Sequence, residues 1–378
     1  MKKTVAVFFG GRSPEHDISI ITALSSVIKP LLLTKKYTIV PVYITKTGKW
    51  VSDAKLLDIK NYQGHAIDDL AKKAKSLAVS FDGGFTIAKK RIDIAFPAMH
   101  GAYGEDGSLM GLLRMAGIPF VGSDMDASVI AMDKVLTKQV ASANAIPTSK
   151  YVFFFRTDIT KNAQAVAGKI EKTLTYPLFV KPAHLGSSIG ISKVKNTLEL
   201  TNALEVAAYY DEKIIVEEAV PNLVEVTVPI IGNSILTPAL VEQPLTIGDN
   251  LFDFDKKYLS GGGKKGGAKQ SGSQGYSELP AKIPTSLYEK SLFVAESVYR
   301  AIGATGIARI DLLIDEKKGE VYFNEVNPLP GSLYAHNWRA SGISGVELVE
   351  KLIDYAEERF EEKNKLTSTF DSSFLQQF

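Results

Sequence analysis

The chain contains no cysteine among its 378 residues. This absence excludes a disulfide scaffold, a thiolate metal site and a cysteine nucleophile, and it is typical of a reducing compartment. A chain of this length buries roughly 75% of the surface that it exposes when unfolded, so its cores need no covalent cross-links. We therefore expect a cytoplasmic protein with ordinary hydrophobic cores.

Membrane spans and an excess of one charge are also absent. No apolar run approaches the roughly 18 residues that a membrane helix needs, so we expect no membrane partner. The 44 Lys and Arg residues nearly balance the 42 Asp and Glu residues, which argues against binding to nucleic acid. The pattern GxxxxGK[ST] occurs nowhere, and this excludes a P-loop nucleotide site.

Alternating apolar and helical patterns divide the chain into three units, 1–122, 123–213 and 214–378. The first unit predicts an open parallel sheet with strands at 4–9, 37–44 and 92–97, a helix at 105–117 and a closing strand to Val121. The second predicts a small α+β domain with a helix from 123 to about 144, strands at 151–155, 177–180 and 191–194, and helices at 161–173 and 197–210. The third begins near Ile214 and ends with a helix at 346–360. The fold class is therefore α/β and α+β.

Two runs in the third unit, Gly306 to Ile314 and Val321 to Asn327, predict a β-hairpin. If Asp311 lies opposite Glu325, then Arg309 lies opposite Asn327, and all four side chains share one face. Two carboxylates and an amide oxygen suit Mg²⁺ or Mn²⁺ bound to nucleotide phosphates. The alternative is an exposed cross-strand salt bridge between Arg309 and the acids.

A lysine and a glycine loop lie together in the central unit. Lys181 ends a strand, and the loop Gly186-Ser187-Ser188-Ile189-Gly190 follows it. Glycine loops bring backbone N–H groups close to phosphate oxygens, and a lysine can neutralise them. The alternative is an ordinary glycine hairpin with a surface lysine.

The same loop has an alternative interpretation. Gly186, Ser188 and Gly190 also match the pattern GxSxG, which forms the nucleophile elbow of serine hydrolases. His336 would then be a possible base. The elbow requires a helix directly after the serine, whereas 191–194 predicts a strand. A GxGxxG match at 261–266 has no strand–helix context, and we treat it as chance.

Two loops in the first unit reach the carboxyl edge of the predicted sheet, where open α/β sheets bind ligands. One carries Glu15, which could hold a substrate ammonium, and the other carries His100 and Glu105. Helix capping and an ordinary loop histidine are the alternatives.

Together these motifs resemble the ATP-grasp superfamily and, closely, the D-alanine:D-alanine ligases. The resemblance covers nearly the whole chain and rests on segments in the family's order: GGRSPEHDIS, HGAYGEDGSLMGLL, GIPFVGS, MDK at 132–134, KPAHLGSSIG, FDFDKKY, GIARIDLLID and NEVNPLPG. It implies a three-domain ATP-grasp fold with an N-terminal open parallel-sheet domain. It also implies ATP with two Mg²⁺ or Mn²⁺ ions, D-alanine as substrate and a homodimer.

The resemblance also implies roles for individual residues. For ATP these are Lys134, Lys181, Ser188, Glu217, Glu218, Val220, Glu225 and Lys257. For the metal they are Asp311, Glu325 and Asn327. For the first D-alanine and the reaction they are Glu15, His100, Ser187, Tyr258, Arg309 and the backbone of Gly331, and for the second D-alanine Ser332 and Leu333.

The implied reaction joins two D-alanines through an acyl phosphate to give a peptidoglycan precursor. Acyl phosphates hydrolyse in water, so the Gly- and Lys-rich segment 260–275, which cannot bury apolar surface, is expected to be a lid. Pro328 and a shortened stretch after it depart from the family pattern. A D-lactate, D-serine or other amino-acid acceptor is therefore the alternative, although Tyr258 favours an amine.

Overall fold

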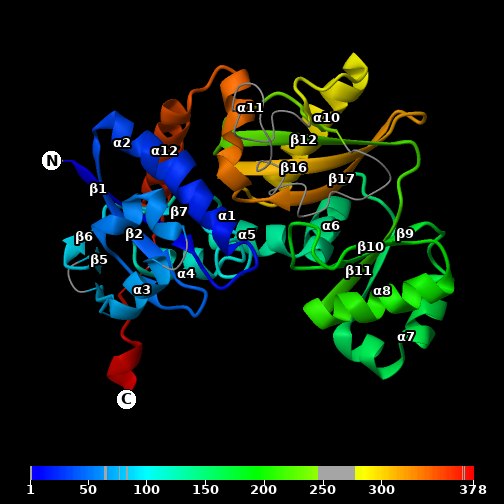
Figure 1. Ribbon diagram of the computed structural model, residues 1–378, viewed down its shortest axis with the longest axis horizontal. Coiled ribbons are helices and arrows are strands. Elements are labelled where there is room, and N and C mark those ends of the chain that lie inside the picture. The colour runs from blue at the N-terminus through cyan, green and yellow to red at the C-terminus, as the bar shows by residue number, and fades with distance from the viewer. Residues whose placement is uncertain are drawn as a thin grey trace.

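The computed structural model describes most of the chain, namely residues 2–63, 66–75, 77–81, 84–245, 277–367, 369 and 371–378. Its strands form three four-stranded sheets, one three-stranded sheet and one two-stranded sheet within these residues. The three larger sheets follow one another along the chain and form three units (Figure 1).

The first sheet has the order β3-β2-β1-β7 and is parallel except for its edge strand β3. Its strands are β1 (Lys3–Gly10), β2 (Tyr37–Ile44), β3 (Trp50–Val51) and β7 (Ile94–Pro97). Val5, Val7 and Phe9 enter one core, and Ala6 and Phe8 enter another on the opposite face. Burial on both faces explains the uninterrupted apolar run of β1, and the predicted open parallel sheet is confirmed. The expected strand ending at Val121 is only an isolated bridge between Ala95 and Phe120.

Helices and short strands surround this sheet. They are α1 (His16–Ile21), η1 (Thr22–Ile28), α2 (Lys29–Thr34), η2 (Ala54–Leu57), η3 (Ile59–Tyr62), α3 (Ala66–Lys73), β4 (Val79–Ser80), β5 (Thr86–Ile87), β6 (Lys90–Arg91) and α4 (Ser108–Met115).

The segments α1, η1 and α2 form one continuous run, His16–Thr34, whose middle part is a π-helix. By length and composition this run of 19 residues, with mean hydropathy 1.5, could cross a membrane, which corrects the expectation that no such stretch exists. Half of it is buried inside the protein. Val27 and Leu31 lie in the same core as β1 and α12 (Gly345–Asn364).

The central sheet has the order β10-β9-β11-β8 and is antiparallel. Its elements are β8 (Tyr151–Phe155), α7 (Arg156–Ile170), β9 (Leu178–Pro182), β10 (Ser192–Val194), α8 (Thr197–Tyr210) and β11 (Lys213–Glu218). Both helices share one core with the sheet. Because β11 pairs with β8 and β9, the central sheet continues past the predicted boundary at residue 213.

The third sheet has the order β13-β12-β16-β17 and packs against α10. Its elements are β12 (Leu223–Gly232), β13 (Leu236–Pro238), α10 (Thr285–Ala301), β16 (Gly306–Asp315) and β17 (Glu320–Asn327). The pair β14 (Gln243–Pro244) and β15 (Ser277–Glu278) forms the two-stranded sheet, and η4 (Gly331–Tyr334), α11 (Ala335–Ala340), α12 and η5 (Phe374–Gln377) follow β17.

The helix expected from 123 to about 144 is two helices, α5 (Met125–Met132) and α6 (Lys134–Ala143). Asp133 separates them because its carboxylate accepts hydrogen bonds from the backbone N–H groups of Val135 and Leu136 and so begins a new helix. Ala131 and Ala141 belong to the core of the third sheet. These helices therefore pack against the third sheet, and Val135 of α6 also packs against Ile215 of the central sheet.

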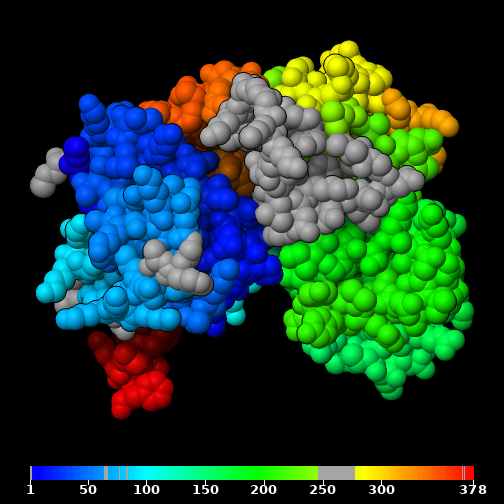
Figure 2. Space-filling model, in the orientation of Figure 1, coloured from blue at the N-terminus to red at the C-terminus, as the bar shows by residue number. Residues whose placement is uncertain are grey.

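Segments far apart in sequence meet in the assembled molecule. The last long helix, α12, lies beside α2 of the first unit (Figure 1). Figure 2 shows a notch between the N-terminal unit and the central unit. Residues from all three units line the site described next.

Candidate active site

The hairpin of β16 and β17 has the predicted register. Asp311 lies opposite Glu325, and Arg309 lies opposite Asn327. The register shifts between Asp311 and Leu312, which is paired with Phe323, so Asn324 is an extra residue in β17. Such a β-bulge re-aims neighbouring side chains and is common beside functional sites.

The face of this hairpin has the donor chemistry of a divalent metal site. The Arg309 guanidinium donates two hydrogen bonds to Asp311, at 2.7 and 2.6 Å, and Asn327 Nδ2 donates to the same carboxylate at 3.0 Å. Within the described residues no group of three or more His, Cys, Asp or Glu side chains could hold a metal. Two carboxylates with an amide oxygen on one face still fit an ion that also takes phosphate oxygens.

Two lysines reach this hairpin from elsewhere in the chain. Lys134 at the start of α6 has its Nζ 3.5 Å from Glu325 Oε2 and donates to the carbonyl of Leu185 at 2.7 Å. Lys181 in β9 donates to Asn324 Oδ1 at 3.3 Å. Both lysines are buried, with 8% exposed. Positive charge for phosphates therefore lies directly beside the predicted metal ligands.

A buried carboxylate holds Lys181 in place. Glu217 is 2% exposed, and its carboxylate lies 2.7 Å from Lys181 Nζ and 3.0 Å from Lys138 Nζ. Burial would raise the pKa of Glu217, but the two lysines outweigh it and lower that pKa to about 2. Its side chain is thus paired with two lysines, and its predicted contact with adenine stays a prediction.

Lys138 was missed by sequence reasoning. It is fully buried, and burial lowers its pKa. Its position four residues after Lys134 places the two on neighbouring turns of α6, which is the only signal in the sequence.

The other residues predicted to bind adenine and ribose follow in sequence. Glu218 is half-buried and accepts a hydrogen bond from the backbone N–H of Thr175 at 2.9 Å. Val220 lies in the loop after β11, and Glu225 lies in β12 opposite Leu313. Both are half-buried, and their roles stay predictions.

A short hydrogen bond joins the glycine loop of the central unit to the N-terminal unit. Ser187 Oγ donates to Glu15 Oε1 at 2.5 Å. Ser187 and Ser188 both have left-handed backbones, with φ of +55° and +60°, which costs free energy and is common in ligand-binding loops. This bond joins Ser187 and Glu15, two residues that the family resemblance places at the first D-alanine.

The serine-hydrolase interpretation is wrong. Residues 187–190 form a turn, strand β10 follows, and the next helix begins only at Thr197. A nucleophile elbow needs a helix directly after the serine. His336 Nε2 also lies 2.9 Å from Glu242 Oε2, in a different pairing.

His100 links the first unit to the loop after β17. It is 3% exposed, and its Nε2 lies 2.8 Å from Thr22 Oγ1. The same oxygen accepts a hydrogen bond from the backbone N–H of Ser332 at 2.8 Å. Burial lowers the pKa of His100, but the Glu105 carboxylate beside it reverses the shift and raises that pKa overall. Thr22, at the start of the π-helical turn, was missed because nothing in its neighbourhood marks it.

The short loop after Asn327 is tightly held. Ser332, Leu333 and Tyr334 are successive left-handed residues, with φ between +52° and +53°. The backbone N–H of Leu333 donates to Pro330 at 2.8 Å, and its side chain is fully buried. The N–H groups of Ser332 and Leu333 therefore both donate within the protein. The predicted substrate contacts of Gly331, Ser332 and Leu333 stay predictions.

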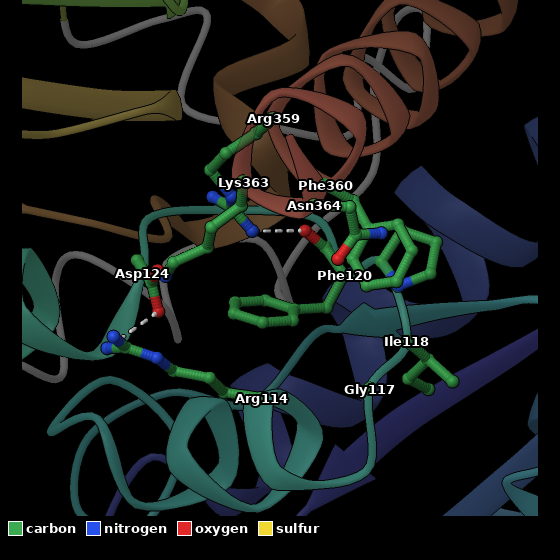
Figure 3. A pocket seen from close by; sticks show the side chains of 10 residues that line it. Arg114, Gly117, Ile118, Phe120, Asp124, Arg359, Phe360, Lys363 and Asn364 are labelled. Carbon is green, nitrogen blue, oxygen red and sulfur yellow. Dashed lines mark hydrogen bonds and ion pairs between the residues drawn. The ribbon is translucent and has the colours of Figure 1, made fainter. Parts of the chain in front are cut away.

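The predicted residues Lys257 and Tyr258 and the predicted lid 260–275 lie outside the described residues. Two cavities formed by described residues lie away from Lys134, Lys181 and Arg309. The larger, of 370 Å³, lies beside Gly11, Arg12 and Met99. The smaller, of 130 Å³, lies between α4 and the end of α12, with Phe120 and Arg359 in its wall (Figure 3).

The three sheets, the two lysines and the carboxylate hairpin define an ATP-grasp fold. Family models for the D-ala D-ala ligase N-terminus and C-terminus match residues 4–123 and 140–354. The chain belongs to the D-alanine:D-alanine ligase family.

Individual relatives agree with this assignment. The chain is 37% identical to the D-alanine--D-alanine ligase of Chloroherpeton thalassium, over 96% of this chain and 98% of the relative. It is 38% identical to that of Chlorobium limicola, over 95% and 98%. Among solved structures it resembles the D-alanine-D-alanine ligase of Coxiella burnetii, with TM-score 0.77, 26% identity and coverage of 96% and 98%. VanG D-Ala:D-Ser ligase of Enterococcus faecalis is similar too, with TM-score 0.77, 32% identity and coverage of 94% and 100%.

Proposed function

We propose that this enzyme joins two D-alanines into D-alanyl-D-alanine with hydrolysis of ATP to ADP, for peptidoglycan precursor synthesis. The observation that carries the proposal is the meeting of Lys134 and Lys181 with the face of the β16–β17 hairpin. A carboxylate reacts with an amine only after activation, and this arrangement suits phosphoryl transfer to the carboxylate of the first D-alanine.

Each residue then has a task in that reaction. Lys134 and Lys181 offset the charge of the transferring phosphoryl group, with Ser188 in the loop over the phosphates. Glu15 holds the ammonium of the first D-alanine, and His100 lies at the same subsite. Arg309 and the backbone of Gly331 stabilise the oxyanion when the second amine attacks the acyl phosphate. Removing one such donor costs about 10²–10³ in rate.

Asp311, Glu325 and Asn327 would hold the divalent metal ions. We propose that there are two of them, either Mg²⁺ or Mn²⁺. Bound there, the metal supplies positive charge that neutralises the phosphates. Glu218, Val220, Glu225 and Lys257 would contact the nucleotide, and Tyr258 would complete the contact between Glu15 and Ser187.

The wider setting of the enzyme is also part of the proposal. We place it in the cytoplasm as a homodimer of three-domain chains, with the central domain extended to include β11. Sedimentation of the purified chain tests the dimer.

An ADP-release assay over D-amino acids and D-hydroxy acids, with product masses measured, tests the activity. We expect ADP release that depends on D-alanine and a product of the mass of D-alanyl-D-alanine. Lys181→Met should lose turnover, whereas Lys169→Met, on the exposed side of α7, should not. A product containing D-lactate or D-serine in preference to a second D-alanine would contradict the proposed acceptor.

A further inference from the structure

A histidine and a glutamate are paired beside the candidate site, and the proposed function gives them no role. His336 Nε2 lies 3.0 and 2.9 Å from the two carboxylate oxygens of Glu242. Asn337 Nδ2 donates to Glu242 Oε2 at 3.0 Å and to the carbonyl of Leu240 at 2.9 Å. Glu242 is only 2% exposed. Hydrogen bonds from His336, Ser277 and Asn337 lower its pKa even though burial acts the other way.

This pair lies close to the oxyanion arginine. The Tyr334 ring is 4.5 Å from the ring of His336, centroid to centroid, and 5.3 Å from Arg309 Cζ. Ser332, at the other end of the same loop, donates its backbone N–H to Thr22 Oγ1, and this oxygen also contacts His100 Nε2. The loop therefore runs from the first-substrate histidine, past the arginine, to His336.

The contacts of His336 define which ring nitrogen is available. With Nε2 held by Glu242, the proton lies on that nitrogen when the ring is neutral, and Nδ1 keeps its lone pair. Among the described residues no hydrogen bond to Nδ1 is found, and the side chain is 17% exposed. A carboxylate that orients a histidine in this way is the arrangement of a general base.

We propose that His336, oriented by Glu242, is the base that removes a proton from the ammonium of the acceptor. This inference rests on the proposed ligase function. An acceptor D-alanine enters as an ammonium and cannot attack until its nitrogen has a lone pair. The proton passes to His336 Nδ1, the amine forms the C–N bond, and the C–O bond to phosphate breaks. The electron pair and a second nitrogen proton leave with phosphate, and His336 returns its proton to water.

Several charged or titratable groups surround His336 among the described residues. Glu242 lies against Nε2, Tyr334 lies against the ring, and Arg309 with its partner Asp311 lies beyond the Tyr334 ring. The measurement therefore compares two nucleophiles at one pH rather than relying on a titration alone. Hydroxylamine is neutral at pH 7.5 and needs no base to attack an acyl phosphate.

The experiment measures dipeptide formation and, with hydroxylamine replacing the acceptor, hydroxamate formation from D-alanine and ATP. For His336→Gln we expect kcat/KM for the acceptor to fall about 10²-fold, while the hydroxamate rate stays near that of the wild type. Glu242→Gln should act in the same direction. Arg339→Gln, on the exposed face of the same helix, is the matched control and should leave both rates unchanged.

Two outcomes would overturn the inference. Equal losses of dipeptide and hydroxamate would mean that His336 only supports the structure, and an unchanged dipeptide rate would mean that it has no role. His336→Asn repeats the comparison if the glutamine variant does not fold. A wild-type enzyme that gives neither ADP nor hydroxamate would instead contradict the proposed function itself.

Discussion

At the scale of single residues, the site depends on charges that are buried together. Lys138, Lys181 and Glu217 form a triad of two cations and one anion with almost no solvent contact. Burying charges is costly, and such a group is stable only while its members stay paired. The triad therefore fixes Lys181 beside the β16–β17 hairpin, where its Nζ also contacts Asn324.

Lys138→Met should lower the free energy of unfolding by about 3 kcal/mol, because Glu217 then keeps only one of its two partners in a buried place. Urea unfolding measures the change. Lys169→Met, at an exposed position, is the control and should shift stability by less than about 0.5 kcal/mol. A Lys138→Met protein as stable as the wild type would show that the triad does not depend on this lysine.

His184 gives stability a dependence on pH. Hydrogen bonds to Asp133 and Asp211 raise its pKa from 6.5 to about 9. A pKa that is higher in the folded protein stabilises fully below pH 6.5, and the contribution is lost as the pH rises through 9. Because a third of the side chain is exposed, we expect a loss of about 1–2 kcal/mol. Urea unfolding at pH 6 and pH 10 should show this loss in the wild type, and a much smaller one in His184→Gln.

At the scale of elements, the hairpin of β16 and β17 arranges the predicted metal ligands through its bulge. The extra residue Asn324 lets Glu325 face Asp311 while Phe323 still enters the core. Successive side chains in a strand point to opposite faces, so adding or removing one residue reverses every side chain beyond it. The bulge thus serves the core and the site together.

Inserting one alanine between Asn324 and Glu325 should therefore lower ADP release by at least 10²-fold, because Glu325 and Asn327 would turn away from Asp311. Asn324→Ser keeps the residue count and removes only the contact with Lys181, so it should lose far less. The ADP-release assay compares the two variants. Equal activity in both would mean that the bulge does not set the site.

At the scale of the whole molecule, Arg359 of α12 joins the first and third units. Its guanidinium donates to the carbonyls of Gly122 and Phe120 and to Thr305 Oγ1, and it lies 4.5 Å from the Phe120 ring. These contacts hold the end of the first unit against the start of β16 in the wall of the smaller cavity (Figure 3).

Arg359→Met should lower the free energy of unfolding by about 3 kcal/mol, since two buried carbonyl groups and a hydroxyl lose their donor. The control is Lys363→Met, which removes a partly exposed ion pair with Asp124 and should cost less than about 1 kcal/mol. Thermal unfolding of both variants measures the difference. A smaller effect for Arg359→Met than for Lys363→Met would contradict the assigned role.

The local sequence pattern was sufficient to predict the strands β1, β2 and β8, the helix α8, and the register of the β16–β17 hairpin, because each depends on neighbours in sequence. It was insufficient where distant groups compete. The helix before residue 144 breaks at Asp133, whose carboxylate is also held by Lys213 of the central sheet. The side chain of Glu217 likewise forms ion pairs with two lysines that are distant from it in sequence.

By itself the sequence determined the order of elements and the family, since alternation, capping and motif spacing act over a few residues. Only the tertiary structure decided that β11 belongs to the central sheet, that Thr22 joins His100 to Ser332, and that His336 pairs with Glu242. Those outcomes depend on which buried polar groups pair with one another across the whole chain, and no local sequence pattern predicts that pairing.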